Sequence, residues 1–318
     1  MNGNYGFVSV MMPAYNAEKY IEEAINSILS QTYPYFELII VDDGSTDRTS
    51  DSIHSFKDER IIYLKHSTNM GVSTARNTAL KVAKGKWGAM ADADDVWLPE
   101  RLEKLLEAIE SEPYGKYFIA DNHTICFDSQ SGLVKWKSAF ELFYNINSKE
   151  ILELSLSDFL KEGSPILHPF FPLSCVKAYN ILFNPKTRFA EDFEFVCNLF
   201  RIGLKLKLLS DSYYLYRLTP GSITGGKYSI NGSINALESL ISTDGFTEEE
   251  KDMFRALLEQ ERVESKYREF SFYLKKRNFS KALVLALMNP SLPFKLVARL
   301  PKILRYRLTA ILKGGKIK

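Results

Sequence analysis

Three carboxylates, Asp92, Asp94 and Asp95, stand within four residues, directly after the apolar run that begins at Trp87. At the end of a buried strand such side chains repel one another unless a positive charge lies among them. Mg²⁺ or Mn²⁺ meets that need, because these ions take one or two protein carboxylates and complete their coordination with water and phosphate oxygens. The alternative is a loop whose aspartates cap the helix that Pro99 begins. This stretch alone leaves both interpretations open.

A second acidic pair, Glu191 and Asp192, opens an apolar helix that runs to Phe200. A carboxylate within reach of a hydroxyl group can take its proton and so act as a general base. Carboxylates also favour the first turn of any helix because of the helix dipole. The pair alone therefore favours a structural role.

Alternating strands and helices must position these residues. The apolar runs that predict short buried strands are 7–12, 36–41, 61–64 and 87–91. Such strands, separated by helices, are typical of a parallel sheet covered on both faces. Polar clusters follow three of the strands, at 14–16, 42–45 and 92–95. Because ligands bind at the carboxyl ends of the strands in such sheets, we expect these clusters to lie together.

Two of the predicted helices carry residues of interest for a site. Asn16 can cap the helix after the first strand, and a helix over 71–84 carries Arg76.

From 121 to 209 the pattern is irregular and rich in aromatic residues, which favours long loops that select a substrate.

The bulk composition is that of a soluble globular protein, with 318 residues of which 45% are hydrophobic and 25% charged. That length suggests one large domain with an appendage, or two domains. Cys126, Cys175 and Cys197 form no CxxC pair, so neither a zinc site nor a disulfide framework is indicated and a reducing cytosol fits best. We expect no signal peptide before Pro13 and no apolar run long enough to span a bilayer.

Charge is distributed unevenly. Residues 270–318 hold twelve Lys or Arg and no Asp or Glu, so of the net +2 they carry +12 and residues 1–269 carry −10. Segments 294–300 and 303–313 mix apolar and basic residues at helical spacing, as helices on anionic membrane surfaces do. The alternative is that they pack on the acidic remainder of the chain. We expect no nucleic-acid partner, because the tail lacks a recognised binding module.

Two common nucleotide folds are excluded by their central motifs. A dinucleotide-binding domain would carry G-x-G-x-x-G after its first strand, where this chain has Pro13-Ala14-Tyr15-Asn16, and no P-loop GxxxxGK[ST] occurs. What remains is a nucleotide site built from side chains, with a metal in place of a glycine-rich loop for the phosphates.

Taken together, the motifs resemble the inverting glycosyltransferases of the GT-A fold, specifically the large second family of enzymes that build bacterial polysaccharides and cell-surface glycans. They are, in chain order, VSVMMPAYN (8–16), SILSQT (27–32), ELIIVDDGSTD (37–47), NMGVSTARN (69–77), DADD (92–95) and ED (191–192). The resemblance implies an α/β GT-A domain over 1–225 with a mostly parallel, Rossmann-like sheet and helices on both faces. Its nucleotide-binding half would be about 1–120 and its acceptor-side half about 121–225, and 226–318 would form a helical, basic C-terminal extension.

The resemblance also implies nucleotide-binding residues. Those lining the pocket for the base and ribose would be Pro13, Ala14, Tyr15 and Asn16. Asp43 would hydrogen bond to uracil or ribose. Arg76 would reach the nucleotide from its helix; without the family context it would be a solvated helical arginine.

The remaining roles concern the metal and the chemistry. Asp94 would contact the metal, and Asp92 the ribose or a water on the metal, whereas Asp95 could equally cap a helix. Asp192 would be the general base, with Glu191 supporting it or contacting the acceptor. Many family members carry a histidine near the diphosphate where this chain has Thr219, which puts a third protein ligand to the metal in doubt. Arg217 and Ser222 could still approach the diphosphate, although Arg217 could instead pair with a carboxylate.

The resulting expectation is a glycosyltransferase that uses Mn²⁺ or Mg²⁺ and inverts the configuration of the transferred sugar. The donor would be a nucleotide sugar, UDP-linked, and the acceptor a hydroxyl of a glycan or lipid-linked glycan in surface polysaccharide biosynthesis. The non-enzymatic alternative is a sugar-nucleotide-binding scaffold of a polysaccharide assembly complex. We expect a cytoplasmic protein, with peripheral attachment to the inner face of the cell membrane if the basic tail binds lipid.

Overall fold

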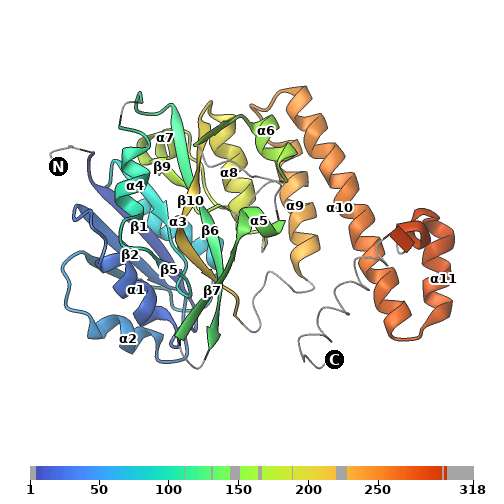
Figure 1. The fold of residues 1–318 in the computed structure, drawn as a ribbon, viewed down its shortest axis with the longest axis horizontal. Coiled ribbons are helices and arrows are strands. Elements are labelled where there is room, and N and C mark those ends of the chain that lie inside the picture. The colour runs from blue at the N-terminus through green and yellow to red at the C-terminus, as the bar shows by residue number, and fades with distance from the viewer. Residues whose placement is uncertain are drawn as a thin grey trace. The chain divides into compact units, whose positions relative to one another are not determined.

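A computed structural model describes residues 5–110, 112–129, 132–143, 151–163, 167–187, 189–219, 228–295 and 297–298. The chain divides into two compact units, Met1–Phe254 and Arg255–Lys318. The first unit contains a mixed ten-stranded sheet with helices packed on it (Figure 1).

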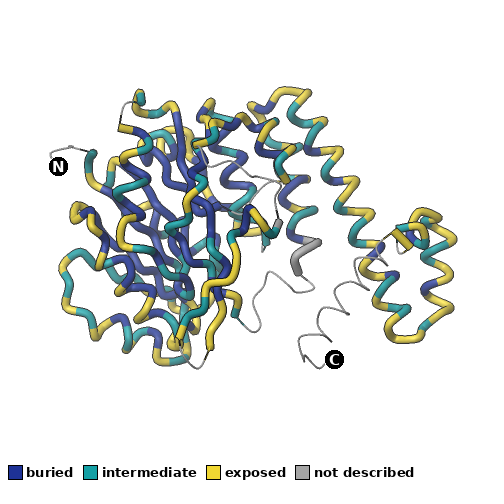
Figure 2. The backbone as a smooth tube through the Cα atoms, in the orientation of Figure 1, coloured by how far each residue is buried: buried dark blue, intermediate teal, exposed yellow. Residues whose placement is uncertain are grey.

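The four strands predicted from the N-terminal apolar runs are present. They are β1 (Val8–Ala14), β2 (Phe36–Asp42), β3 (Ile61–Lys65) and β4 (Trp87–Met90). They pair in parallel in the order β3-β2-β1-β4. β1, β2 and β4 are buried along nearly their whole length, whereas β3 is only partly buried (Figure 2). Because their carboxyl ends lie at one edge, the polar clusters after β1, β2 and β4 are neighbours, as predicted.

The segment 121–209, expected to be irregular, supplies most of the second half of the sheet. Its strands are β6 (Tyr117–Ser129), β7 (Gly132–Ser138), β8 (Leu152–Leu154), β9 (Phe170–Pro172) and β10 (Lys205–Arg217), and β5 (Val96–Trp97) lies just before it. β6 and β10 pair in parallel, whereas β9 joins β4 to β6 by antiparallel pairing. The expectation was wrong because β6 buries polar residues, among them Asp121, Asn122 and His123, which hide the strand from a hydrophobicity pattern.

The helices of the first unit lie between the strands. Those before β6 are α1 (Ile21–Leu29), α2 (Thr49–Ser55), α3 (Val72–Val82) and α4 (Arg101–Glu107). Those after β7 are α5 (Ala139–Phe143), α6 (Leu156–Lys161), α7 (Leu173–Ala178), α8 (Glu191–Arg201) and α9 (Tyr228–Ser242). α3 packs on β1 and β2, and α9 packs on α8.

The predicted cap at Asn16 is wrong. Helix α1 begins at Ile21, and no side chain caps it. Asn16 instead has a left-handed backbone with φ of 48°. Its side-chain oxygen accepts a hydrogen bond from the Thr46 amide at 2.9 Å, and its own amide donates to the Ser45 hydroxyl at 3.0 Å. Asn16 therefore ties the loop after β1 to the loop after β2.

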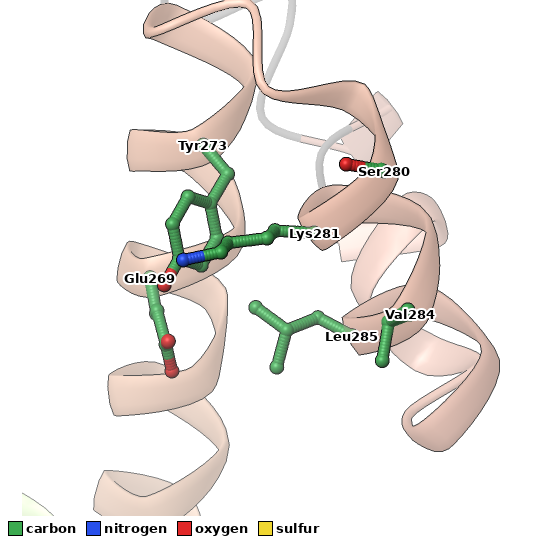
Figure 3. Close-up of a pocket in the computed structure, with 6 residues that line it drawn as sticks. All are labelled: Glu269, Tyr273, Ser280, Lys281, Val284 and Leu285. Atoms are coloured by element: carbon green, nitrogen blue, oxygen red, sulfur yellow. The ribbon is translucent and has the colours of Figure 1, made fainter.

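The second unit is helical. Helix α10 (Glu248–Lys275) leads into it, and α11 (Phe279–Met288) packs on α10 around Tyr267, Phe270, Ala282 and Leu292. A small hollow between these helices is lined by Lys281, which lies over the Tyr273 ring, and by Leu285 (Figure 3). No helix in the described ranges has the length and hydrophobicity of a membrane span. The predicted helix over 303–313 lies outside the described residues, as does the end of 294–300.

Candidate active site

The acidic loop after β4 is held rigidly by strand β10. The Tyr214 hydroxyl donates to the Asp95 carboxylate at 2.7 Å and lies 3.4 Å from the Asp92 amide. Arg217 donates from its amide to Asp95 and from Nε to the carbonyl of Asp94, each at 2.8 Å. Asp95 is buried, and no side chain caps α4, so Asp95 anchors the loop and does not cap a helix. Burial, with Asp94 and Asp92 nearby, raises the pKa of Asp95 well above its usual range.

The Asp92 carboxylate is clamped by two cationic or polar partners. Arg76 of α3 donates to one oxygen at 3.0 Å, and Nε2 of His168 lies 2.9 Å from the other. Burial alone would raise the pKa of Asp92, but Arg76 and then His168 outweigh it and hold that pKa well below its usual range. Asp92 is therefore ionised and fixed in orientation.

Arg76 links Asp92, in the acidic loop after β4, to Glu191 on α8. Its second terminal nitrogen donates to Glu191 at 2.8 Å. The side chain is buried, so the alternative of a solvated helical arginine is wrong. Burial opposes its charge, but Asp92 and Glu191 outweigh that effect and raise the pKa of Arg76. Nε is buried and has no hydrogen-bond partner among the described residues, which leaves one N–H group for a ligand.

Asp94 is the carboxylate of this loop that, within the described ranges, lacks a protein hydrogen-bond donor from another side chain, although the charge of Arg217 partly offsets its own. In the part of the chain that the structure describes, no other side chain donates a hydrogen bond to it. Burial, and after it the charge of Asp92, raises the pKa of Asp94 to about 6. A half-buried carboxylate next to a second one, with no protein cation on it, fits a divalent ion that completes its coordination with phosphate and water.

A second group of potential metal ligands is less suitable. Atoms of Asp92, Asp95 and His168 lie within 4.8 Å of one another. However, both oxygens of Asp95 accept hydrogen bonds from β10, and Nε2 of His168 is bonded to Asp92. These atoms already have hydrogen-bond partners within the protein, so Asp94 is the better candidate for a metal ligand.

The start of α8 is positioned by a strained turn and by helix α9. Ala190, just before Glu191, has a left-handed backbone with φ of 65°. Gly232 of α9 approaches so closely that a Cβ atom there would lie 2.4 Å from Cβ of Phe189 and 2.6 Å from its carbonyl oxygen. Since real Cβ atoms do not approach this closely, only glycine fits at 232.

Farther along α8, a buried glutamate anchors the helix. Glu194 accepts hydrogen bonds from Thr187 at 2.8 Å, Ser239 at 2.5 Å and Asn184 at 3.1 Å. At the helix start, Asp192 accepts a hydrogen bond from the Phe193 amide at 2.7 Å. These contacts hold the start of α8 in place, and with it Glu191 and Asp192 next to Arg76.

Of the predicted nucleotide-binding residues, Pro13 and Ala14 end strand β1, Tyr15 and Asn16 follow it, and Asp43 follows β2. Tyr15 is 48% exposed, whereas Ala14 is buried and its carbonyl accepts from the Asp43 amide at 2.8 Å. The Asp43 carboxylate accepts from the amides of Met70 and Gly71, at 3.0 and 2.7 Å, and contacts His66. It therefore fixes the turn that leads into α3, and its contact with uracil or ribose stays a prediction.

Arg217 pairs with carboxylates. Its guanidinium contacts Glu23 and Asp128 and lies 4.7 Å from the centre of the Tyr20 ring. Thr219 is half-buried, and Ser222 lies outside the described residues. A contact of Arg217 with a diphosphate stays a prediction.

Sequence reasoning missed His168, His123 and Tyr214. All three are buried at the site, with the rings of His168 and Tyr214 stacked 4.2 Å apart. The signal that could have found the histidines is their rarity, since the chain has four, and the position of His168 within an apolar, proline-rich stretch.

The sequence is similar to those of known proteins. Residues 9–145 match glycosyl transferase family 2. Over 227 residues the chain is 32% identical to the UDP-Glc:alpha-D-GlcNAc-diphosphoundecaprenol beta-1,3-glucosyltransferase WfaP of Escherichia coli, a match that covers 70% of this chain and 81% of WfaP. The similarly named WfgD of Escherichia coli is 43% identical over 122 residues, 37% of this chain and 48% of WfgD. The match to WfgD thus spans about half the length of that relative.

Solved structures share the fold. Staphylococcus aureus TarS 1–349 in complex with UDP-GlcNAc has a TM-score of 0.66 at 22% identity, covering 87% of this chain and 79% of that one. The mannosyltransferase PcManGT from Pyrobaculum calidifontis, in complex with GDP-Man and Mn²⁺, has a TM-score of 0.57 at 17% identity, covering 91% and 83%. The predicted GT-A architecture is confirmed, and with the match to WfaP the chain belongs to glycosyltransferase family 2.

Proposed function

We propose that this protein is a metal-dependent, inverting glycosyltransferase that moves a sugar from a UDP donor to a hydroxyl of a glycan or lipid-linked glycan in surface polysaccharide biosynthesis. The observation that carries the proposal is the bridge from Asp92 through Arg76 to Glu191, with distances of 3.0 and 2.8 Å. This bridge joins Asp92 of the acidic loop to Glu191, the neighbour of Asp192, which we propose as the base. A buried cation such as Arg76 is costly to a fold without carboxylate partners, so Asp92 and Glu191 are held in fixed positions beside it.

The names of the relatives support the choice of substrates. WfaP and WfgD are named for a UDP-Glc donor and a diphosphoundecaprenol-linked GlcNAc acceptor, and the TarS structure holds UDP-GlcNAc. We propose a UDP-sugar and a lipid-linked glycan for this chain on that basis.

In the proposed reaction the Asp192 carboxylate takes the proton of the acceptor hydroxyl as its oxygen attacks the anomeric carbon. A new carbon–oxygen bond forms on one face of the sugar. The bond to the diphosphate breaks on the other face, and UDP leaves with the electron pair. A single displacement of this kind inverts the configuration and needs no covalent enzyme intermediate.

Asp94 would hold the Mn²⁺ or Mg²⁺, with Asp92 next to the ribose or to a water on the ion. When bound, a divalent ion neutralises the charge that develops on the leaving diphosphate. We propose that Arg76 reaches the nucleotide with its guanidinium, which also holds Asp92 at 3.0 Å.

The direct test is a donor screen. The full chain is incubated with a set of UDP-, GDP- and dTDP-sugars and Mn²⁺, and release of the nucleoside diphosphate is measured with and without a chelator. We expect release from a UDP-sugar that the chelator suppresses. Release that is unaffected by the chelator would contradict the metal dependence. Binding of UDP-sugars without release of UDP, whichever glycan or lipid-linked glycan acceptor is added, would favour the non-enzymatic scaffold.

Metal binding should depend on pH through Asp94. Since the pKa of the metal-free carboxyl is raised to about 6, a proton competes with the ion below that pH. We expect the association constant for Mn²⁺, measured by titration calorimetry in the presence of UDP, to be constant above pH 7 and to fall about tenfold per pH unit below pH 6. An affinity that is unchanged from pH 7.5 to 5 would contradict a role for Asp94 as ligand.

We further propose that the basic C-terminal extension binds an anionic membrane surface on the cytoplasmic side. One face of α11 packs on α10 through Ala282, whereas Phe279, Leu283 and Leu287 on the other face are 65%, 60% and 73% exposed. At 1.5 Å per residue the ten residues of α11 extend about 15 Å, half the thickness of a bilayer core, so the helix can only lie in the interface. Residues 270–318 carry a charge of +12 in the sequence, which suits anionic headgroups.

Flotation of the full chain with vesicles tests this proposal. We expect binding to vesicles that contain phosphatidylglycerol, weaker binding at high salt, and little binding to neutral vesicles. Leu283→Glu with Leu287→Glu should reduce flotation at least about tenfold, whereas Tyr179→Glu, an equally exposed control on the first unit, should not. Equal flotation of all variants would contradict the proposal and favour packing of the tail on the acidic part of the chain.

A further inference from the structure

We infer that His168 is a positioning residue for the reaction proposed above: it donates a hydrogen bond that fixes the Asp92 carboxylate, and His123 and Tyr214 hold its ring in place. The inference rests on the proposed function for its role in substrate binding. The geometry that carries it does not depend on the identity of the substrate.

The fold brings His168 to Asp92 through strand pairing. Strand β9 begins two residues after His168 and pairs antiparallel with β4, whose carboxyl end leads to Asp92. The backbone carbonyl of His168 accepts a hydrogen bond from Arg101 at 3.2 Å. The imidazole is 5% exposed, and Nε2 lies 2.9 Å from the second oxygen of Asp92.

The ring is held on two further sides. Tyr214 stacks on it with centroids 4.2 Å apart and planes 13° apart, and the same tyrosine donates to Asp95. Nδ1 of His168 lies 3.3 Å from Nε2 of His123. His168 can therefore neither rotate about its χ angles nor retract from Asp92 without displacing its neighbours.

The hydrogen-bond network assigns the proton positions. An ionised Asp92 only accepts, so Nε2 of His168 must carry a proton. Nδ1 of His168 lies within hydrogen-bond distance of Nε2 of His123, and one of these two nitrogens carries the proton between them. Burial lowers the pKa of His123 well below its usual range, in agreement with a neutral ring. His168 therefore donates to Asp92 from Nε2 and is held by His123 through Nδ1.

The two clamps on Asp92 come from different elements, which is why each is needed. Arg76 lies on α3, holds one Asp92 oxygen and also pairs with Glu191, so the second Asp92 oxygen needs another donor. His168, which lies just before β9, contacts the other Asp92 oxygen. β9 is the neighbour of β4 in the sheet. Loss of such a supporting partner typically weakens ligand binding about 10- to 100-fold.

A pair of substitutions separates this role from simple packing. His168→Phe keeps a flat ring against Tyr214 but removes the donor, whereas His168→Gln keeps an N–H donor in a smaller volume. We expect the Phe variant to bind UDP with Mn²⁺ about 10- to 100-fold more weakly than the unmodified chain in calorimetry, and the Gln variant to recover most of the affinity. A Phe variant that binds UDP like the unmodified chain, or a Gln variant that loses as much as Phe, would overturn the inference.

A second measurement uses the unmodified chain and needs no ligand. Long-range ¹H–¹⁵N spectra at pH 8 should show Nε2 of His168 protonated. A bare Nε2 at His168 would overturn the inference, whether or not the variants fold. If the unmodified chain binds no UDP-sugar, the proposed function fails, and the tautomer still decides whether His168 positions Asp92.

Discussion

Replacing Asp192 with asparagine is expected to lower kcat by about 10²- to 10⁴-fold, the usual contribution of a general base. The asparagine cannot take a proton from the acceptor hydroxyl. It has nearly the same shape, and its side-chain oxygen can still accept the Phe193 amide that Asp192 accepts at 2.7 Å. Folding and donor binding should therefore be preserved, and the loss should appear in kcat and not in the KM for the UDP-sugar.

Glu191→Gln is the matched control on the same helix turn. Because Glu191 pairs with Arg76 at 2.8 Å, its neutralisation leaves Arg76 less compensated and should raise the KM for the donor, with a smaller effect on kcat. Steady-state kinetics with saturating Mn²⁺ distinguishes the two patterns. If Asp192→Asn remains folded and keeps most of its turnover, Asp192 is not the base.

Replacing Asp94 with asparagine is expected to remove metal binding and at the same time to stabilise the metal-free protein. Asparagine is a poor ligand for Mn²⁺ or Mg²⁺, so the affinity should fall at least about 100-fold, in keeping with the several kcal/mol that such an ion contributes. The stability effect follows from the pKa, which is about 6 in the folded chain and about 3.9 in an unfolded one.

The sign of that effect is fixed by proton linkage. The folded state binds the Asp94 proton more tightly than the unfolded state does. The contribution of this proton to the stability of the fold is therefore fully present below about pH 4 and is lost as pH rises through about 6. At pH 7.5 the ionised carboxylate destabilises the metal-free fold, and the neutral asparagine does not. We expect the Tm of Asp94→Asn to exceed that of the unmodified chain without metal, and the rise in Tm that Mn²⁺ with UDP produces in the unmodified chain to disappear.

Asp95→Asn is the control in the same loop. Asp95 accepts from the Tyr214 hydroxyl and from the Arg217 amide, and asparagine would turn one of these acceptors into a donor. Its Tm should fall, because a buried group is left unsatisfied. An Asp94→Asn protein that still gains stability from Mn²⁺ would show that the ion binds elsewhere.

The first half of the sheet could be predicted because its strands are continuous apolar runs. β1, β2 and β4 are buried along nearly their whole length, so hydrophobicity alone marks them. β6 could not be predicted in this way. Asp121 is buried only because Arg101, 20 residues away, neutralises it, and Asn122 because it donates to the carbonyl of Ser210, 88 residues away.

The candidate site shows the same division. The order of the motifs identifies Asp92, Arg76 and Glu191, but their direct contact depends on α3 and α8 meeting across 115 residues of chain. Nothing local marks His168 as a partner of Asp92, since that contact arises from the pairing of β9 with β4. The position of Asn16 predicts a helix cap, whereas its contacts are with Ser45 and Thr46, 29 and 30 residues away.

The approach of Gly232 to Phe189 determines where the chain can be cut. A fragment that ends at residue 225, where the family resemblance ends, would lack α9 and with it the surface that supports the turn before Glu191. Glu194 would also lose the Ser239 hydroxyl and be left with a buried, partly unsatisfied charge. A shortened protein that keeps this support must therefore extend to about Phe254, where the first unit ends, and the same position is the natural junction for chimaeras between relatives.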